Sequence, residues 1–276
     1  MHHLIDFAHS LFGEKLLHRN NLRQTVGLKC HMSNPISAPM VTLSIVSHGH
    51  GDMLPGLLKD IERTIDTAYE LILTFNIAED ERFLQDFPRI PIKILRNSRP
   101  LGFGQNHNQA FRYCKSPVFV IVNPDIRAQP FALKPLIEAL SQDQTGASGP
   151  QIVSNEGITQ DSARYFPTLR SLLSRRLANN PLDYLPTQRN QIVDWLAGML
   201  VAFKSDAYRA VAGFDEKYFM YVEDVDIARR LQAAGYTSVW VPSLKFIHDA
   251  QHSSRKNLTH LWWHLRSMAR YLLSSI

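Results

Sequence analysis

The sequence has only two cysteines, Cys30 and Cys114, among its 276 residues. Two cysteines are too few for a disulfide framework or a cysteine-rich zinc site, and neither one belongs to a partner motif. Such a scarcity is typical of proteins that work in a reducing compartment.

Long apolar runs are also absent. No run approaches the roughly 20 residues that span a bilayer, and the first residues lack the basic region and uninterrupted apolar core of a secretory signal. We therefore expect a cytoplasmic protein. Residues 1–38, which are rich in histidine and weakly periodic, are expected to be a non-native or flexible extension, with Met32 as a candidate native start.

Basic residues are not concentrated in any one run of the chain. The formal net charge is +5, and the basic residues are spread out rather than run together, which does not favour a nucleic-acid partner. A phosphate-bearing ligand or an anionic membrane surface is compatible with this balance. The hydrophobic content of 45% is enough for one substantial core.

Strand patterns alternate with helix patterns over much of the chain. Apolar runs rich in β-branched residues cover 41–46, 70–75, 92–95 and 118–122, with helical or polar segments between them. The alternation predicts an α/β fold with a mostly parallel, Rossmann-like sheet and ligands at the carboxyl ends of its strands. The alternation of strand and helix patterns is lost between about 161 and 189, and we expect this segment to cross the open end of the sheet.

Two residues that follow strand-like runs are candidate metal ligands. Asp125 comes directly after the run 118–122, so its carboxylate is expected to face the ligand crevice, and His248 follows the run 244–247. One carboxylate and one imidazole suit Mn²⁺ or Mg²⁺ that already holds a diphosphate. The alternative is an Asp turn and an unrelated surface histidine.

A glycine-containing loop at 97–108 opens a helix. The free N–H groups and positive dipole of such a helix start favour an anion. The glycine spacing matches neither the dinucleotide nor the Walker motif, so the sequence does not predict those cofactors. A plain turn followed by a helix cap explains the loop nearly as well.

Three carboxylates, Glu223, Asp224 and Asp226, are crowded at the start of a later helix. Helix capping is the ordinary explanation, and it suffices for Asp226, which is spaced to pair with Arg230. It does not explain the aromatic residues that enclose Glu223 and Asp224. We expect Asp224 to be a general base that the helix dipole keeps ionised near neutral pH.

A fourth cluster combines Asp194, Trp195 and Gly198. An indole beside a carboxylate and a small residue is suited to the floor of a sugar site. A buried core tryptophan is the commoner explanation.

In this order, the segments resemble the family 2 inverting glycosyltransferases, and within them the rhamnosyltransferase-like enzymes of bacterial surface-polysaccharide assembly. The resemblance covers about 41–270 and rests on VTLSIVSHG, NSRPLGFGQNHNQA, VFVIVNPD, FIHDAQHSS and the long run DWLAGMLVAFKSDAYRAVAGFDEKYFMYVEDVDIARRLQAAGY. The run through the acidic junction is highly specific.

The resemblance implies the A-type nucleotide-sugar fold, with a catalytic domain at 39–254 that divides into a donor half, 39–150, and an acceptor half, 151–254. Asp224 falls on the catalytic base and Glu223 on its acidic neighbour, while Asp125 and His248 fall on the metal ligands. The implied donor-binding residues are Ser47, Asn76, Asn97, Gly102, Phe103, Gly104, Asn106, Asn108, Asn123 and Asp125, and the acceptor-binding candidates are Asp194, Trp195 and Gly198.

The activity implied is the inverting transfer of a sugar, with rhamnose from dTDP-rhamnose as the specific guess, to a glycan or lipid-linked acceptor. Two departures from the family pattern bear on it. Asn123 stands where many relatives have an acid, which weakens the metal site, and Phe75 stands where relatives read the nucleobase, which leaves Asn76 for that role. The alternative is a non-catalytic nucleotide-sugar sensor or scaffold, against which the retained Asp224 argues.

The last segment, 255–276, is expected to form an amphipathic helix, with an apolar stripe opposed by basic residues. Core packing is the common explanation of such a stripe. A peripheral contact with the inner face of the cytoplasmic membrane is the alternative, because the relatives act on lipid-linked acceptors.

Overall fold

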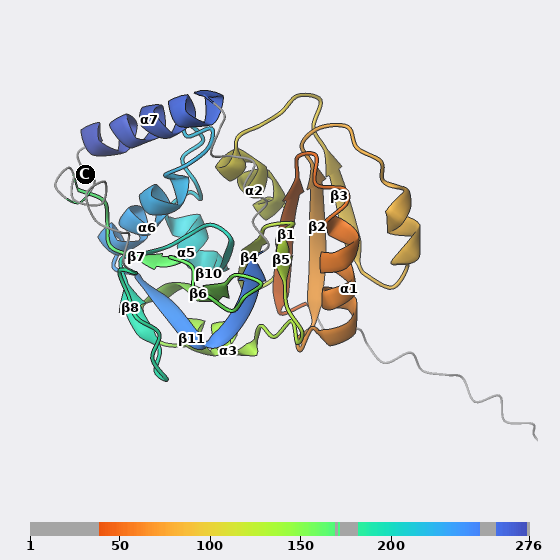
Figure 1. Ribbon diagram of the computed structural model, residues 1–276, viewed down its shortest axis with the longest axis horizontal. Helices are drawn as coiled ribbons and strands as arrows, with labels where there is room; N and C mark the ends of the chain where they lie inside the picture. The colour runs from red at the N-terminus through yellow and green to blue at the C-terminus, as the bar shows by residue number, and fades with distance from the viewer. Residues whose placement is uncertain (1–38, 169–170, 172–181, 249–257, 275–276) are drawn as a thin grey trace, which may run out of the picture. The chain divides into compact units, whose positions relative to one another are not determined.

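The computed structural model describes residues 39–168, 171, 182–248 and 258–274 (Figure 1). The extension expected at 1–38, part of the irregular segment 161–189 and the first residues of the expected closing helix lie outside this part of the chain. Within the described residues, no helix is long and apolar enough to cross a membrane.

The first half of the described chain follows the predicted alternation. Its elements are β1 (Val41–Ser47), α1 (Leu54–Thr64), β2 (Tyr69–Phe75), the 3₁₀ helix η1 (Arg82–Asp86), β3 (Ile92–Arg96), α2 (Phe103–Phe111), β4 (Val118–Val122), β5 (Ile126–Arg127), α3 (Lys134–Leu140) and β6 (Thr145–Val153). The polar segment between β2 and β3 thus contains a short 3₁₀ helix.

The second half is less regular. Its elements are β7 (Ala163–Arg164), β8 (Gln191–Val193), β9 (Trp195–Leu196), β10 (Leu200–Lys204), α5 (Ser205–Ala210), α6 (Glu223–Ala233), β11 (Thr237–His248) and α7 (Leu258–Leu273). The largely apolar segment 191–204 is divided among the three strands β8, β9 and β10. The strand-like run 244–247 is part of the longer strand β11, which has a register shift between Val241 and Lys245.

The main sheet of the described residues has nine strands, eight of them in the order β3-β2-β1-β4-β10-β6-β11-β5, with β8 also paired to β11. Strands β1 to β4 pair in parallel, and so do β6 and β11, whereas β10 runs antiparallel to both of its neighbours. The expectation of a mostly parallel sheet is confirmed. Because β10 is reversed, the residues that precede it lie at the carboxyl ends of the parallel strands.

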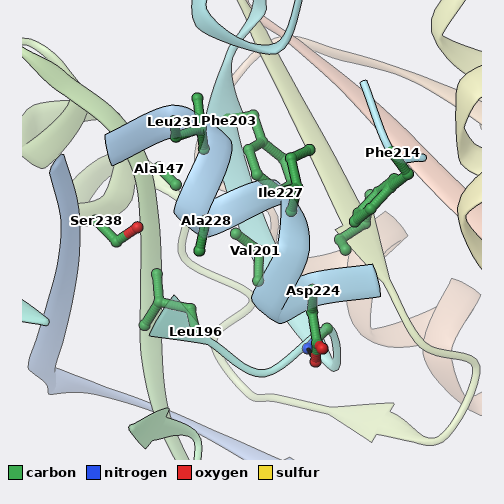
Figure 2. A pocket seen from close by; sticks show the side chains of 12 residues that line it. Ala147, Leu196, Val201, Phe203, Phe214, Asp224, Ile227, Ala228, Leu231 and Ser238 are labelled. Carbon is green, nitrogen blue, oxygen red and sulfur yellow. Dashed lines mark hydrogen bonds between the residues drawn. The ribbon is translucent and has the colours of Figure 1, made fainter. Parts of the chain in front are cut away.

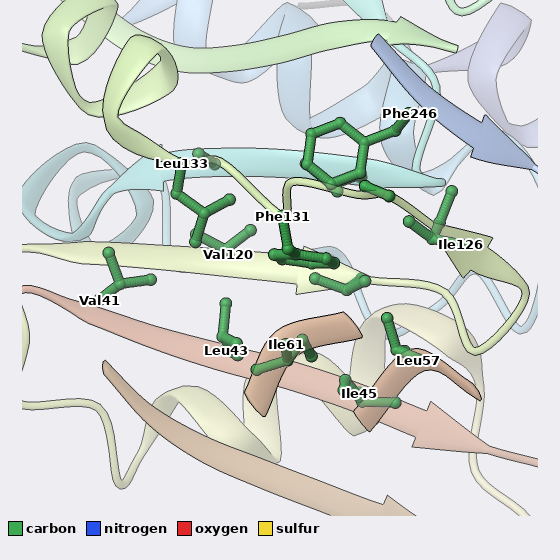
Figure 3. Close-up of a cluster of buried hydrophobic side chains, with 14 of the residues drawn as sticks. Val41, Leu43, Ile45, Leu57, Ile61, Val120, Ile126, Phe131, Leu133 and Phe246 are labelled. Carbon is green, nitrogen blue, oxygen red and sulfur yellow. The ribbon is translucent and has the colours of Figure 1, made fainter. Parts of the chain in front are cut away.

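Each face of the sheet is covered by helices. Successive side chains of a strand point to opposite faces, so a strand that is apolar at every position needs an apolar partner on both sides. Val118, Val120 and Val122 of β4 pack in one core with the leucines of α1 and α3, part of which is drawn in Figure 3. Phe119 and Ile121 of the same strand pack on the other face, in a core with residues of α2, α5 and α6. A third cluster joins α6 to α7 through Val222, Val225 and Tyr271.

Candidate active site

The reversed strand β10 brings two distant segments together at the edge of the sheet. Leu200 pairs with Val122 at the end of β4, and the N–H of Asn123 donates to the carbonyl of Met199 at 2.9 Å. The residues just before β10 therefore lie beside Asn123 and Asp125. A parallel strand would have placed them at the opposite edge.

The backbone is strained where the acidic helix begins. Tyr221 and Val222 both have positive φ, 69° and 71°, a region that is sparsely populated by non-glycine residues and especially by β-branched ones. Each such residue costs on the order of 1–3 kcal/mol and persists only where packing fixes it. Val222 is buried in the cluster between α6 and α7, and this turn directs Glu223 and Asp224 toward the carboxyl edge of the sheet.

Asp224 is held by backbone N–H groups. The Gly198 N–H donates to its Oδ2 at 3.1 Å and the Val225 N–H donates to its Oδ1 at 2.9 Å. Figure 2 shows the Asp224 side chain at the end of a pocket whose other labelled side chains, among them Val201 and Ile227, are mostly apolar. The side chain therefore has a fixed direction and an apolar wall on one side.

Burial dominates the ionisation of this pair of acids. It raises the pKa of Asp224 to about 6, against the lowering effect of the N–H groups of Gly198 and Val225. It also raises the pKa of Glu223 well above the usual range, and the charge of Asp224 adds to that rise. The expectation that the helix dipole would decide the state of Asp224 is corrected, because desolvation is the larger effect.

Asp125 and His248 lie together, with Oδ2 of the carboxylate 3.1 Å from Nε2 of the ring. Gln160 fixes the ring from its other side. Its amide nitrogen donates to the carbonyl of His248 at 3.2 Å, so its amide oxygen must be the atom that accepts from Nδ1 at 2.9 Å. The Nε2 lone pair therefore faces the Asp125 carboxylate, and the two atoms could both be ligands of one metal ion.

The donor set fits a divalent metal with only part of its coordination from protein. The other carboxylate oxygen of Asp125, Oδ1, is buried and has no hydrogen-bond partner, so a ligand position is left over. Among the described residues, no group of three or more His, Cys, Asp or Glu side chains could hold a metal. Mn²⁺ or Mg²⁺ at this place would need further oxygen ligands from a substrate or from water.

The glycine-containing loop is held in place by a network of three asparagines. The amide nitrogen of Asn97 donates to Asn76 Oδ1 at 2.9 Å and to Asn106 Oδ1 at 2.6 Å. Asn76 Oδ1 also accepts from the Leu101 N–H, and its Nδ2 donates to the Leu101 carbonyl. The amide of Asn76, expected to read a nucleobase, is thus already engaged in shaping the loop.

A cavity of about 730 Å³ opens between these segments. The residues of the candidate set that line it are Asn76, Phe103, Asn106, Asn123, Asp125, Gly198, Glu223 and Asp224. The structure therefore brings the expected base and the expected metal ligand Asp125 to one cavity. Its volume lies within the usual range for a small-molecule site.

Eight residues of the candidate set do not line this cavity: Ser47, Asn97, Gly102, Gly104, Asn108, Asp194, Trp195 and His248. Asn108 bonds to Tyr208 and to the backbone of Phe214. Asp194 accepts from the Phe166 N–H and Trp195 donates to the Tyr165 carbonyl, so both tie down the segment that contains β7. Ser47 donates to Glu79, which also accepts from the Gly49 N–H.

Further residues that line the cavity were not among the predicted site residues. His48, Tyr221, His260 and Trp263 line the cavity, and the Tyr221 hydroxyl lies 2.7 Å from His260 Nδ1. Tyr221 belongs to the aromatic residues beside Glu223 and Asp224, whose presence next to the acids indicated an unusual site. His260 and Trp263 lie on α7, about 40 residues away, where helical spacing alone indicated only a packed face.

Comparison with known proteins agrees with this arrangement. A family model described as glycosyltransferase like family 2 matches residues 39–271. Rhamnosyltransferase WbbL of Escherichia coli (strain K12) is 30% identical over 247 residues, which cover 84% of this chain and 92% of that protein. N-acetylglucosaminyl-diphospho-decaprenol L-rhamnosyltransferase of Mycobacterium tuberculosis is 28% identical over 253 residues, which cover 82% of each.

Solved structures with the same architecture include GalNAc-T7 with UDP, GalNAc and Mn²⁺, at a TM-score of 0.63 and 16% identity, which covers 84% of this chain and 48% of that one. They also include the mannosyltransferase PcManGT from Pyrobaculum calidifontis with GDP-Man and Mn²⁺, at a TM-score of 0.60 and 16% identity, which covers 86% and 65%. This chain thus spans about half to two thirds of their lengths. The expected A-type nucleotide-sugar fold is confirmed.

Proposed function

The chain belongs to glycosyltransferase-like family 2, and from this premise we propose that it transfers rhamnose from a nucleoside-diphosphate sugar to a lipid-linked glycan acceptor, with inversion at the anomeric carbon. Sugar transfer follows from the family. The one observation that carries the proposed chemistry is that Asp224 and Asp125 line the same cavity, because the reaction needs a base and a diphosphate site that share one space with the sugar.

Asp224 is the proposed general base. An acceptor hydroxyl attacks the anomeric carbon, the bond to the diphosphate breaks on the opposite face, and the hydroxyl proton passes to the Asp224 carboxylate. The N–H groups of Gly198 and Val225 hold that carboxylate in one orientation. With a pKa of about 6, the group is ionised near neutral pH, yet it is more basic than an exposed aspartate.

Glu223 is proposed to remain neutral beside it. Its side chain is buried, and its Oε2 has no hydrogen-bond partner. Because two charges so close together repel each other, one acid keeps its proton while the other ionises. Burial raises the pKa of Glu223 well above the usual range, so the ionised member of the pair is Asp224.

The donor diphosphate is proposed to lie near Asp125 and the start of α2. Asp125 and His248 would hold Mn²⁺ or Mg²⁺, whose positive charge would stabilise the leaving diphosphate. Support comes from the unpartnered Asp125 Oδ1 and from the Mn²⁺ in the structures with the same fold. The Phe103 N–H at the start of α2 already donates to the Phe219 carbonyl at 2.9 Å, so the contribution proposed for this helix is its positive dipole and not that N–H group.

Rhamnose and a lipid-linked acceptor are proposed from the relatives. Both compared relatives are named rhamnosyltransferases, and one name specifies a diphospho-decaprenol acceptor. The nucleotide proposed is deoxythymidine diphosphate. A thermal-shift screen of nucleoside-diphosphate sugars, with and without Mn²⁺, tests the donor: dTDP-rhamnose should raise the Tm most, and an equal rise with every sugar nucleotide would contradict this choice.

Helix α7 is proposed to rest on an anionic membrane at its inner face. Leu261, Trp262 and Leu265 are each more than half exposed, although the opposite side of the helix packs on the α6 cluster. An apolar outer face of this kind suits the boundary between headgroups and acyl chains. Co-sedimentation with phosphatidylglycerol vesicles should fall for Leu261→Ser/Leu265→Ser, and binding that does not depend on these residues would rule the contact out.

A further inference from the structure

A second cavity, of about 340 Å³, adjoins the proposed active site. It lies between α7 and the segment that leads into α6, and it is lined by Glu216, Lys217, Phe219, Trp263, Arg266 and Arg270, among others. Phe219 and Trp263 also line the larger cavity that contains Asp224. Their rings are 4.9 Å apart, so one aromatic wall separates the two spaces.

The second cavity carries an excess of positive charge. Lys217, Arg266 and Arg270 line it, and within the described part of the chain none of the three forms an ion pair with a carboxylate. Arg270 lies over the Tyr218 ring at 6.0 Å and Arg266 over the Trp262 ring at 5.2 Å, contacts that orient a guanidinium without neutralising it. Glu216 is the carboxylate in this lining, and its Oε1 accepts from Asn108 at 3.2 Å.

We infer that this cavity binds the phosphate groups of the acceptor, an inference that rests on the proposed function. Arginine and lysine side chains that are free of carboxylate partners are the usual ligands of phosphate in proteins. In an acceptor whose sugar is joined directly to a diphosphate, the phosphate and the reacting hydroxyl are on the same ring. A phosphate site just beyond the aromatic wall therefore places that ring in the cavity with Asp224.

The outer face of α7 fits the remaining part of such a molecule. The exposed Leu261 and Leu265 lie on the same helix as Arg266. A lipid tail that leaves the phosphate site can thus continue along apolar side chains toward a membrane. Sugar, diphosphate and lipid are accommodated in the order in which they are joined.

The test uses farnesyl diphosphate, a soluble isoprenoid diphosphate, and titration calorimetry on the full chain. Lys217→Ala/Arg266→Ala removes two exposed positive charges from the second cavity. Lys59→Ala/Arg63→Ala, on the exposed side of α1, removes the same charges elsewhere and is the matched control. With Mn²⁺ present in every titration, Asp125→Asn removes a proposed metal ligand and so reports any binding of the probe at the donor site.

The first double variant should weaken farnesyl diphosphate binding roughly 10- to 100-fold, the effect of losing one or two charge-assisted contacts, while the control and Asp125→Asn bind normally. Loss in Asp125→Asn alone would place the probe at the donor site and overturn the inference. Unchanged diphosphate affinity with lost binding to phosphatidylglycerol vesicles would assign the cavity to bilayer headgroups and also overturn it. Because the probe carries no sugar, failure of sugar transfer by the native chain is a separate result.

Discussion

Replacing Asp224 with asparagine should change the pH dependence of stability as well as abolish transfer. Burial raises the pKa of Asp224 from 3.8 to about 6. The folded state therefore keeps a proton that the unfolded chain releases, and stability attributable to this group is lost as pH rises between these values. At about 1.4 kcal/mol for each pKa unit, the loss between pH 4 and pH 7 is about 2 kcal/mol.

Urea unfolding of the native chain and of Asp224→Asn at pH 4 and pH 7 measures this loss. Titrations that the two proteins share cancel when their pH-dependent changes are subtracted. Making both proteins in a Glu223→Gln background removes a neighbouring acid whose pKa depends on the charge of Asp224. The native chain should lose about 2 kcal/mol more than the variant over this interval. Parallel changes in the two proteins would mean that Asp224 titrates as an exposed acid does and would refute the argument from burial.

Three further predictions concern the base, the histidine and the loop. The rate of transfer should rise with pH through about 6, as Asp224 loses its proton, and a rate that is flat between pH 5 and 7.5 would exclude it as the base. Gln160→Ala should weaken Mn²⁺ binding about tenfold, because the His248 ring loses the hydrogen bond that orients it. Electron paramagnetic resonance without substrate measures this binding. Gln160→Glu keeps an acceptor and should bind Mn²⁺ as the native chain does, and equal loss in both variants would contradict the positioning role. Gly102→Ala should lower stability by about 1–3 kcal/mol, since its methyl group would lie 2.7 Å from the Phe219 carbonyl oxygen; an unchanged midpoint of urea unfolding would contradict this.

The fold was predictable where local pattern and tertiary environment agree. The run 118–122 is apolar at every position because β4 is buried on both faces, and Gly235 follows α6 with positive φ as a helix-ending glycine does. Strand β6 was missed, since it contains Gly146, Gly149 and Pro150, residues that strands disfavour. These glycines are accommodated because Tyr236 and Leu196 fill the space beside them, and this packing has no local sequence signal.

The site residues were predictable where the local sequence marks them, and not where strand pairing brings them together. Carboxylates in an apolar, aromatic context marked Asp224 and Glu223 as unusual, and Asp125 followed from its place after a buried strand. The reversal of β10, which brings Gly198 to Asp224, depends on strand pairing and not on any local period. The bond from Gln160 to His248 joins residues 88 positions apart, and no spacing rule covers such a distance.

The most direct test of the central claim is the anomeric configuration of the product, determined by NMR after transfer from dTDP-rhamnose, together with turnover by Asp224→Asn. A base opposite the leaving diphosphate predicts a glycosidic bond of inverted configuration, and a variant that still binds the donor but transfers about 10²–10⁴-fold more slowly. A product that retains the configuration of the donor, or near-normal turnover by the variant, would contradict the account.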